Sequence, residues 1–199
     1  MRQIDQMGTF PDEYYVQQIL EGKIQVYSVL IDRYKHMVFT LAKRMLKNTE
    51  DAEEVAQDAF LKAYKGLSTF KGEAKFSTWL YRIAYHRSLD YIKRNQRQID
   101  TADLPIEDAG SLTVLEEGFD TLEQKERARQ IKEAIEALSG DDGLLLTLHY
   151  YQELSIKEIA QIVNKSEGAV KVNLHRSRKR LAKILEKKLN ILNTVRYAN

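Results

Sequence analysis

The sequence lacks cysteine altogether, contains few prolines and has no long hydrophobic run. The absence of cysteine excludes disulfides, thiol catalysis and cysteine-based zinc or iron–sulfur sites, and it is typical of a reducing compartment. No stretch approaches the roughly 18 apolar residues of a membrane-spanning helix, and residues 1–10 lack the apolar core of a signal peptide. We therefore expect a cytoplasmic protein. With 2 prolines and 9 glycines in 199 residues, the composition favours long helices and few tight turns.

The net charge of +2 conceals an uneven distribution of charge along the chain. Residues 75–97 hold six Lys/Arg against one Asp, and residues 157–188 hold ten Lys/Arg against three Glu. Between them, residues 100–124 hold eight Asp/Glu and no Lys/Arg. Two basic blocks that flank an acidic spacer indicate two nucleic-acid-binding segments more clearly than the total charge does.

Helical periodicity dominates the apolar pattern, and no alternating strand pattern is present. Residues 100–120 contain Pro105 and Gly110 and have no sustained period, so they are predicted to form a flexible linker. The predicted fold is all-α, with two small helical domains at 1–98 and 121–199 and the acidic linker at 99–120. The predicted helices cover 12–21, 24–46, a segment from Asn48 or Thr49 to a break at 66–72, 77–95, 121–138, 144–151, 156–163 and 167–185.

The strongest local motif is a helix-turn-helix near the C-terminus. Ser155 and Glu158 form a capping box at the start of a short helix, Asn164 suits a left-handed exit, and Ser166 can cap a longer second helix. A short helix, a tight turn and a longer helix make up this DNA-binding motif. The second helix should present basic residues outward to phosphates and base edges, namely Lys171, His175, Arg176 and Lys179. A solvated helical hairpin is the alternative, but the cap-turn-cap pattern favours DNA binding.

A second segment, residues 68–94, mixes aromatic with basic residues. Aromatic rings stack on unpaired bases while cations follow the sugar-phosphate backbone, which is typical of single-strand binding. Alternatively, the aromatic residues form core. We expect Trp79 in the core and Phe70 and Phe76, which border a glycine-containing loop, to meet a base.

Three motifs in order resemble the extracytoplasmic-function (ECF) sigma factors of bacterial RNA polymerase. Residues 70–84 (FKGEAKFSTWLYRIA) look like the promoter-melting segment of that family, and residues 50–60 (EDAEEVAQDAF) resemble its polymerase-docking helix. Residues 153–160 (ELSIKEIA), 166–171 (SEGAVK) and 174–178 (LHRSR) are similar to its region 4. The likeness spans about 24–97 and 123–187, which is most of the chain.

The resemblance implies a sigma factor that binds core RNA polymerase and directs promoter recognition and melting. It implies a polymerase-binding set of Asp51, Glu54, Gln57, Asp58 and Leu61. The downstream (−10) element would be bound by Phe70, Lys71, Gly72, Lys75, Phe76, Ser77, Thr78, Arg82, His86, Arg87, Lys93 and Arg94. The upstream (−35) element would be bound by Ser166, Glu167, Lys171, His175, Arg176 and Lys179. The acidic linker would enter the polymerase, mimicking nucleic-acid charge, and an anti-sigma factor, often a membrane protein, would hold the chain inactive.

Two departures from the family pattern concern promoter specificity. His86 stands where the family commonly has Asn, and Val172-Asn173 stands where it commonly has Ser-Arg. Because histidine titrates near neutrality, His86 could make DNA affinity sensitive to pH. Replacing an arginine by Asn173 would remove a phosphate or guanine contact.

Signs of catalysis are scarce. The chain has no phosphate-binding glycine loop and no His-Glu-x-x-His motif, and its four histidines are scattered. The acidic cluster at 50–58 is explained by a solvated helix start or a docking face better than by a metal site. We therefore expect no enzyme activity, cofactor, metal or small-molecule substrate. The alternatives are a polymerase-independent helix-turn-helix regulator and, less readily, a module that sequesters another factor, which would leave both basic blocks unexplained.

Overall fold

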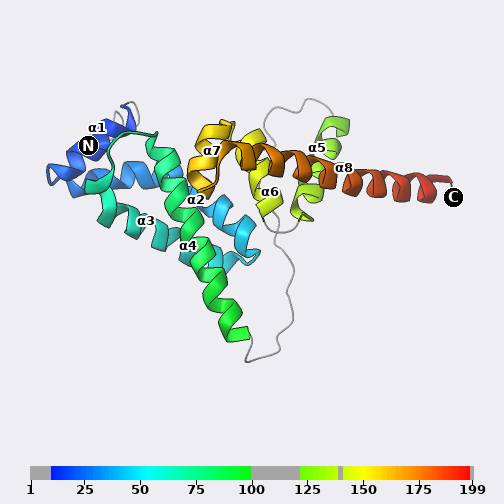
Figure 1. Ribbon diagram of the computed structural model, residues 1–199, viewed down its shortest axis with the longest axis horizontal. Coiled ribbons are helices and arrows are strands. Elements are labelled where there is room, and N and C mark those ends of the chain that lie inside the picture. Colours follow the sequence, from blue (N-terminus) through cyan, green and yellow to red (C-terminus); the bar gives the residue numbers. More distant parts are fainter. Residues whose placement is uncertain (1–9, 100–121, 139–140, 198–199) are drawn as a thin grey trace. The chain divides into compact units, whose positions relative to one another are not determined.

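The computed structural model describes residues 10–99, 122–138 and 141–197, and all of its regular elements are helical. The predicted linker therefore lies outside the described residues except for Ile99, and so does Thr121, the first residue of the helix predicted at 121–138. The helices separate into two compact units, one containing α1 to α4 and the other α5, α6, α8 and the first part of α7, whose last residues 161–163 group with the first unit (Figure 1). Each unit is described by itself.

The first unit is a bundle of three long helices preceded by a short one. It comprises α1 (Asp12–Leu20), the 3-10 turn η1 (Ile24–Val26), α2 (Tyr27–Leu46), α3 (Thr49–Gly66), the 3-10 turn η2 (Leu67–Thr69) and α4 (Phe76–Ile99). Helices α2, α3 and α4 pack against one another (Figure 1). Small side chains on the inner face of α3 permit close packing because they take up little space between the helices. These fully buried residues are Ala52, Ala59 and Ala63.

Caps and turns explain where these helices begin and end. Asn48 caps α3, since its Oδ1 accepts the backbone N–H of Asp51 at 3.0 Å, and Lys47 ends α2 in the left-handed conformation with φ 61°. Pro11, not Asp12, occupies the capping position of α1. The Asp12 carboxylate instead accepts hydrogen bonds from Arg33 and from the hydroxyl of Tyr34, and so ties α1 to α2.

The second unit carries the predicted helix-turn-helix. It comprises α5 (Leu122–Glu136), α6 (Asp141–Leu146), the π-helix η3 (Thr147–Tyr151), α7 (Ile156–Val163) and α8 (Glu167–Tyr197). The predicted helix at 144–151 thus begins three residues earlier and ends in a π-helical turn. Helix α8 runs to Tyr197, well beyond the predicted end at Leu185. The core includes the fully buried residues Leu144, Leu145, Leu146, Leu148, Ile159, Val170 and Leu174.

Candidate nucleic-acid and polymerase interfaces

The local geometry of the helix-turn-helix matches its sequence signals. The Ser155 Oγ accepts the backbone N–H of Glu158 at 3.2 Å, while the Glu158 carboxylate accepts the backbone N–H of Ser155 at 2.9 Å, which confirms the capping box. Asn164 leaves α7 in the left-handed conformation with φ 53°, and Ser166 Oγ accepts the backbone N–H of Ala169 at 3.2 Å at the start of α8. The motif is therefore specified by local hydrogen bonds before packing contributes.

Helix α8 has one buried face and one exposed basic face. Val170, Leu174 and Ser177 are fully buried and hold the helix against its own unit. The side chains expected to meet the upstream promoter element are all exposed, namely Ser166, Glu167, Lys171, His175, Arg176 and Lys179. The last four of these lie along one stretch of the helix, where Lys171 and His175 are four residues apart and Arg176 and Lys179 are three apart.

A buried polar cluster fixes the position of this helix. The Ser177 hydroxyl, fully buried, lies 2.6 Å from Oδ1 of Asp142 and donates to it, while Arg180 forms an ion pair with the same carboxylate. Asp142 belongs to α6 and is itself buried. Sequence reasoning missed this residue because it predicted helices at 121–138 and 144–151 and so left 139–143 outside any helix. The available signal was Ser177, a polar residue two helical turns after Val170 on the apolar face of α8.

Replacing Asp142 by alanine should lower the free energy of unfolding of the second unit by about 1–3 kcal/mol. The substitution leaves the buried Ser177 hydroxyl without its carboxylate acceptor. The expected loss is the usual cost of a lost hydrogen bond to a charged group. Thermal unfolding followed by circular dichroism measures the change. Asp141→Ala is the matched control, because Asp141 pairs with Lys165 at the surface, 2.8 Å away, and should cost about 0–1 kcal/mol. Equal losses in the two variants would contradict the role assigned to Asp142.

The aromatic cluster of the first unit differs from the prediction. Phe76 is only 1% exposed, with its ring 5.7 Å from that of Tyr34 and 5.6 Å from that of Phe70. Thr78 is 2% exposed. Phe76 and Thr78 were expected on the −10 surface, but both side chains are buried in this structure, and we leave them out of the surface proposed below. Trp79, expected in the core, is only half-buried beside Phe70, with ring centroids 5.5 Å apart.

The burial of Phe76 follows from where α4 begins. The sequence prediction started this helix at Ser77 and so placed Phe76 in the loop, whereas the helix includes it. Positions 76, 80 and 84 then fall on one helical face, and Leu80 and Ala84 are fully buried there. The loop before α4 still presents Lys71, Gly72 and Lys75 as exposed residues, with Phe70 and Ser77 half-buried. Gly72 has φ +71°, a backbone conformation that favours glycine.

The predicted DNA-binding cations of α4 and the predicted polymerase-binding acids of α3 lie along the same helix pair. Arg87 forms an ion pair with Asp58, and an Arg94 nitrogen lies 3.6 Å from an Oε1 of Glu54. The Tyr91 hydroxyl donates to Asp51 Oδ1 at 2.6 Å. Burial, and then this hydrogen bond, raise the pKa of the Tyr91 phenol. Two surfaces that the sequence assigned to different partners are thus in electrostatic contact.

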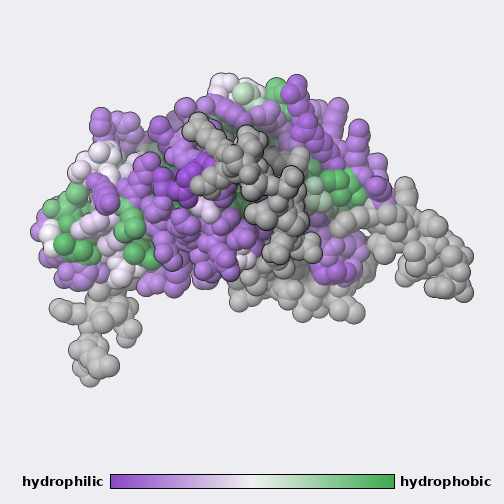
Figure 2. Space-filling model, turned by 90° about the horizontal axis from the view of Figure 1, so that it is seen from below, coloured by the Kyte–Doolittle hydropathy of each residue, from purple (hydrophilic) through white to green (hydrophobic). Residues whose placement is uncertain are grey.

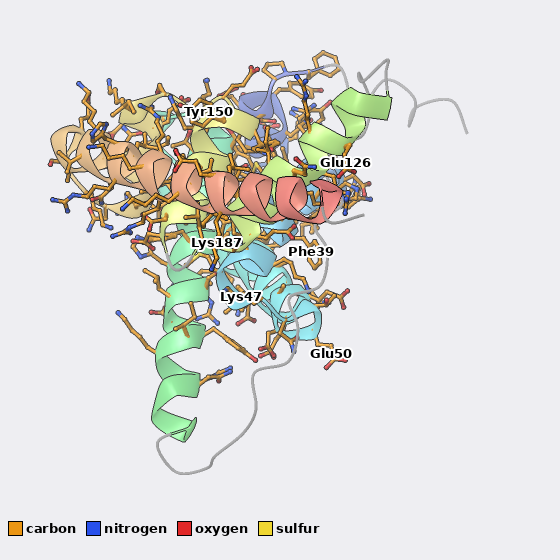
Figure 3. All side chains as sticks on the ribbon, turned by 90° about the vertical axis from the view of Figure 1, so that its right-hand side faces the viewer. Phe39, Lys47, Glu50, Glu126, Tyr150 and Lys187 are labelled. Atoms are coloured by element: carbon orange, nitrogen blue, oxygen red, sulfur yellow. The ribbon has the colours of Figure 1, made fainter. Side chains whose placement is uncertain are left out.

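The rest of the α3 face is open. Glu54, Gln57 and Leu61 are exposed, whereas Asp51 and Asp58 are half-buried against α4. Glu50 at the N-terminal end of α3 points away from the ribbon (Figure 3). Leu61 is one of the large apolar side chains most exposed in the described residues. An exposed leucine surrounded by polar and acidic side chains has the composition of a protein-docking face, with an apolar centre and a polar rim.

His86 lies among cations on α4. Burial is the largest cause that lowers its pKa below the usual 6.5, and Arg82, Lys62 and Lys93 lower it further, while Asp90 opposes them. Arg82 and Lys93 are exposed and lie on the same helix. The imidazole is therefore neutral at neutral pH and acts there as a hydrogen-bonding group rather than a cation.

This lowered pKa determines the sign of any pH effect. Because the folded state binds the proton less readily than the unfolded chain, His86 reduces stability only as the pH falls below about 6.5. Its charge should strengthen DNA binding over the same acidic range. We expect promoter affinity to be the same in wild type and His86→Asn between about pH 7 and 8, and to rise more in wild type near about pH 6. A rise of equal size in His86→Asn, measured by filter binding of the polymerase complex, would contradict this.

Two properties of the described residues bear on other functions. Among the described residues, no group of three or more His, Cys, Asp or Glu side chains is arranged to hold a metal ion. Within the same residues, no helix has the length and apolar character needed to cross a membrane.

Comparison with protein families reproduces the two-part organisation. The family described as Sigma-70 region 2 matches residues 30–98, and the family described as Sigma-70, region 4 matches residues 128–181. The chain is 33% identical to the ECF RNA polymerase sigma factor SigW of Bacillus subtilis, covering 85% of this chain and 94% of that protein. It is 30% identical to the ECF RNA polymerase sigma-E factor of Escherichia coli K12, covering 84% and 90%.

Solved structures share the fold at lower identity. The sigma factor RpoE of Bartonella quintana, solved with the anti-sigma factor NepR, gives a TM-score of 0.66 at 19% identity over 80% of this chain and 96% of that one. CnrH, solved with the cytosolic domain of CnrY, gives a TM-score of 0.60 at 20% identity over 88% and 97%. Both family segments occur in order, and the helix-turn-helix lies within the second. The chain therefore belongs to the ECF RNA polymerase sigma factors.

Proposed function

We propose that this sigma factor binds core RNA polymerase through the exposed face of α3 and positions it on promoters through two DNA-binding surfaces. The observation that carries the proposal is the presence, in one chain, of a region 2 segment with an open α3 face and a helix-turn-helix with an exposed basic face. The corresponding domains are 1–98 and 121–199, with 99–120 as the connection. The family consists of DNA-binding regulators, and we propose no enzyme activity for this member.

The polymerase-binding face centres on Leu61, with Glu54 and Gln57 on the preceding turns. A few central side chains carry most of the binding energy in protein interfaces, while the contacts around them exclude water. Leu61 holds that central position on the exposed face of α3. Asp51 and Asp58 differ from these neighbours because both bind side chains of α4, Asp51 through a hydrogen bond and Asp58 through an ion pair. We assign them to holding α3 and α4 together beneath this face.

The contacts between α3 and α4 link polymerase binding to DNA binding. Glu54 partly neutralises Arg94 in the free chain, and a polymerase contact that occupies Glu54 frees Arg94 for phosphate. The side chains of both are more than half exposed, so the pair is weak and readily exchanged. This exchange favours promoter binding by the holoenzyme over binding by the free sigma factor.

The first DNA surface is the loop that precedes α4 together with the outer face of α4. Phe70 is the aromatic side chain placed to stack on an unpaired base, with Lys71, Gly72, Lys75 and Ser77 around it. Arg82, His86, Lys93 and Arg94 follow along α4 and would contact the DNA backbone, as would Arg87 when released from Asp58. This is the surface proposed to bind the −10 element.

The second DNA surface is the exposed face of α8, proposed to read the −35 element in the major groove. Lys171, His175, Arg176 and Lys179 supply base-edge and phosphate contacts. Ser166 and Glu167 stand at the N-terminus of the helix, where backbone N–H groups face an incoming phosphate. The Asp142 cluster holds this face in place.

We also propose an anti-sigma partner, because both solved relatives were determined with a partner protein and one of these is an anti-sigma factor. Since polymerase and chromosome are cytoplasmic, we place the chain there. Exposed apolar side chains gather on and beside α1, at the left-hand end of the space-filling view (Figure 2), and include Phe10, Leu20 and Ile24. No observation commits this patch to one partner.

Competition for core polymerase tests the docking face. Replacing Glu54, Gln57 and Leu61 together by alanine should reduce affinity for core at least about tenfold, the loss expected from one anchor residue. The chain offers a matched control on α1, where Glu13, Gln17 and Leu20 have the same residue types, similar spacing and exposed side chains. That triple alanine variant should bind core as wild type does. Equal losses in both variants, or none in the first, would contradict the assignment of α3.

A further inference from the structure

Within the exposed basic face of α8 lies one apolar side chain. Val172 is 49% exposed, and Gly168 lies one turn before it, also exposed. His175 and Arg176 lie one turn after it on the same face, and Lys179 follows after another turn. Val172 therefore stands at the centre of the surface proposed to enter the major groove.

Packing within the protein does not account for either small residue. A Cβ built at Gly168 would meet no heavy atom within 4 Å, and the backbone there is helical. Glycine and valine both form helices less readily than alanine, so each is unfavourable at a solvent-exposed helical position. A close approach by an external molecule would explain why Gly168 has no side chain and why an apolar group stands beside it.

The chemistry of the surroundings identifies that molecule. The basic side chains of Lys171, His175 and Arg176 lie within one turn of Val172, so the molecule that meets this surface carries negative charge around an apolar group. In the major groove the only apolar group on a base edge is the C5-methyl of thymine. Valine is also stiff in a helix, because its branched side chain adopts one strongly preferred rotamer, so its methyl groups are held ready for contact.

We infer that Val172 contacts the methyl group of one thymine in the upstream promoter element, and that the bare backbone at Gly168 allows the DNA to approach closely enough for this contact. The inference rests on the proposed function of α8. It makes Val172 a specificity-determining residue that discriminates thymine by its methyl group, while the neighbouring cations hold the phosphates.

Replacing thymine by deoxyuridine tests the contact, because the exchange removes the methyl group and nothing else. A promoter recovered by run-off transcription is remade with each upstream thymine substituted in turn, and transcription is measured with core polymerase and the full chain. With wild type, one position should show a loss of about fourfold, the value of burying one methyl group. With Val172→Ala, transcription from the thymine template should fall by the same factor, and the deoxyuridine substitution should then have no further effect.

Ile131→Ala is the control, since Ile131 is 41% exposed on α5 of the same unit and should leave the deoxyuridine effect at its wild-type size. Gly168→Ala should leave the melting temperature unchanged or higher and still reduce transcription. Two results would overturn the inference alone. In the first, the deoxyuridine substitution has the same effect on wild type and Val172→Ala at every position. In the second, Val172→Ala loses transcription equally on the thymine and deoxyuridine templates, which would indicate a protein contact. The absence of any defined transcript with wild type would instead overturn the proposed function, and this inference with it.

Discussion

Replacing Lys171 and Arg176 together by alanine should reduce transcription from promoters with an upstream element by at least roughly 30-fold. Both side chains are exposed on α8, so their removal leaves the fold of the second unit intact. Each contact to a base edge or phosphate contributes about 1–3 kcal/mol, and two contacts together account for a loss of this size. Run-off transcription with core polymerase gives the activity, and circular dichroism verifies the fold.

A charge-matched control separates this effect from a general loss of basic charge. Arg129 and Lys132 lie on α5 in the same unit, and Arg129 already pairs with Glu126 and Glu133 at 2.7 and 2.8 Å. Their double alanine variant should retain near wild-type transcription. If both double variants lose activity equally, the recognition face is not on α8 where it has been placed.

The second large effect distinguishes Phe76, which should matter for stability, from Phe70, which should matter for promoter opening. Phe76→Ala should lower the free energy of unfolding of the first unit by about 3–5 kcal/mol, because the buried ring is surrounded by Tyr34, Phe70 and Trp79. Phe70→Ala should cost much less, because the ring is half-buried. Trp79 is the single tryptophan of the chain and contacts both rings, so denaturant unfolding followed by its fluorescence reports this unit directly.

The effect of Phe70 on function should appear in promoter opening. Phe70→Ala should reduce open-complex formation by roughly tenfold, in the range of one lost base–aromatic stack, while core binding is unchanged. Phe70→Tyr should restore opening, because it keeps an aromatic face, and Phe70→Leu should not. Full promoter opening by Phe70→Ala, measured by permanganate reactivity of unpaired thymines, would show that Phe70 serves the fold alone.

Local rules predicted the parts of the fold that local hydrogen bonds specify. The capping box at Ser155 and the left-handed Asn164 were predicted from neighbouring residues, and the start of α3 was narrowed to Asn48 or Thr49. Errors of one to three residues at helix starts had large consequences in one place, since the single-residue shift at Phe76 moved a ring from the surface to the core. The longer α8 was also foreseeable, because no glycine or proline follows Leu185 to stop it.

Features that depend on pairing between distant residues were not predictable from periodicity. Asp142 meets Ser177 across 35 residues, and Asp58 meets Arg87 across 29. The sequence shows that each of these residues is polar, but only the packing of α6 on α8 and of α3 on α4 decides which atoms meet. Both pairs bear on the proposed function, the first by holding the recognition helix and the second by joining the polymerase and DNA surfaces.

The most direct test of the central claim is run-off transcription on sheared DNA from the source organism, with purified core polymerase, in the presence and absence of this protein. A sigma factor that acts through both surfaces should produce new, defined transcripts that are lost with Lys171→Ala/Arg176→Ala and with the Glu54, Gln57 and Leu61 triple variant. Absence of new transcripts, together with specific binding to duplex DNA without core polymerase, would contradict the account and indicate a polymerase-independent regulator.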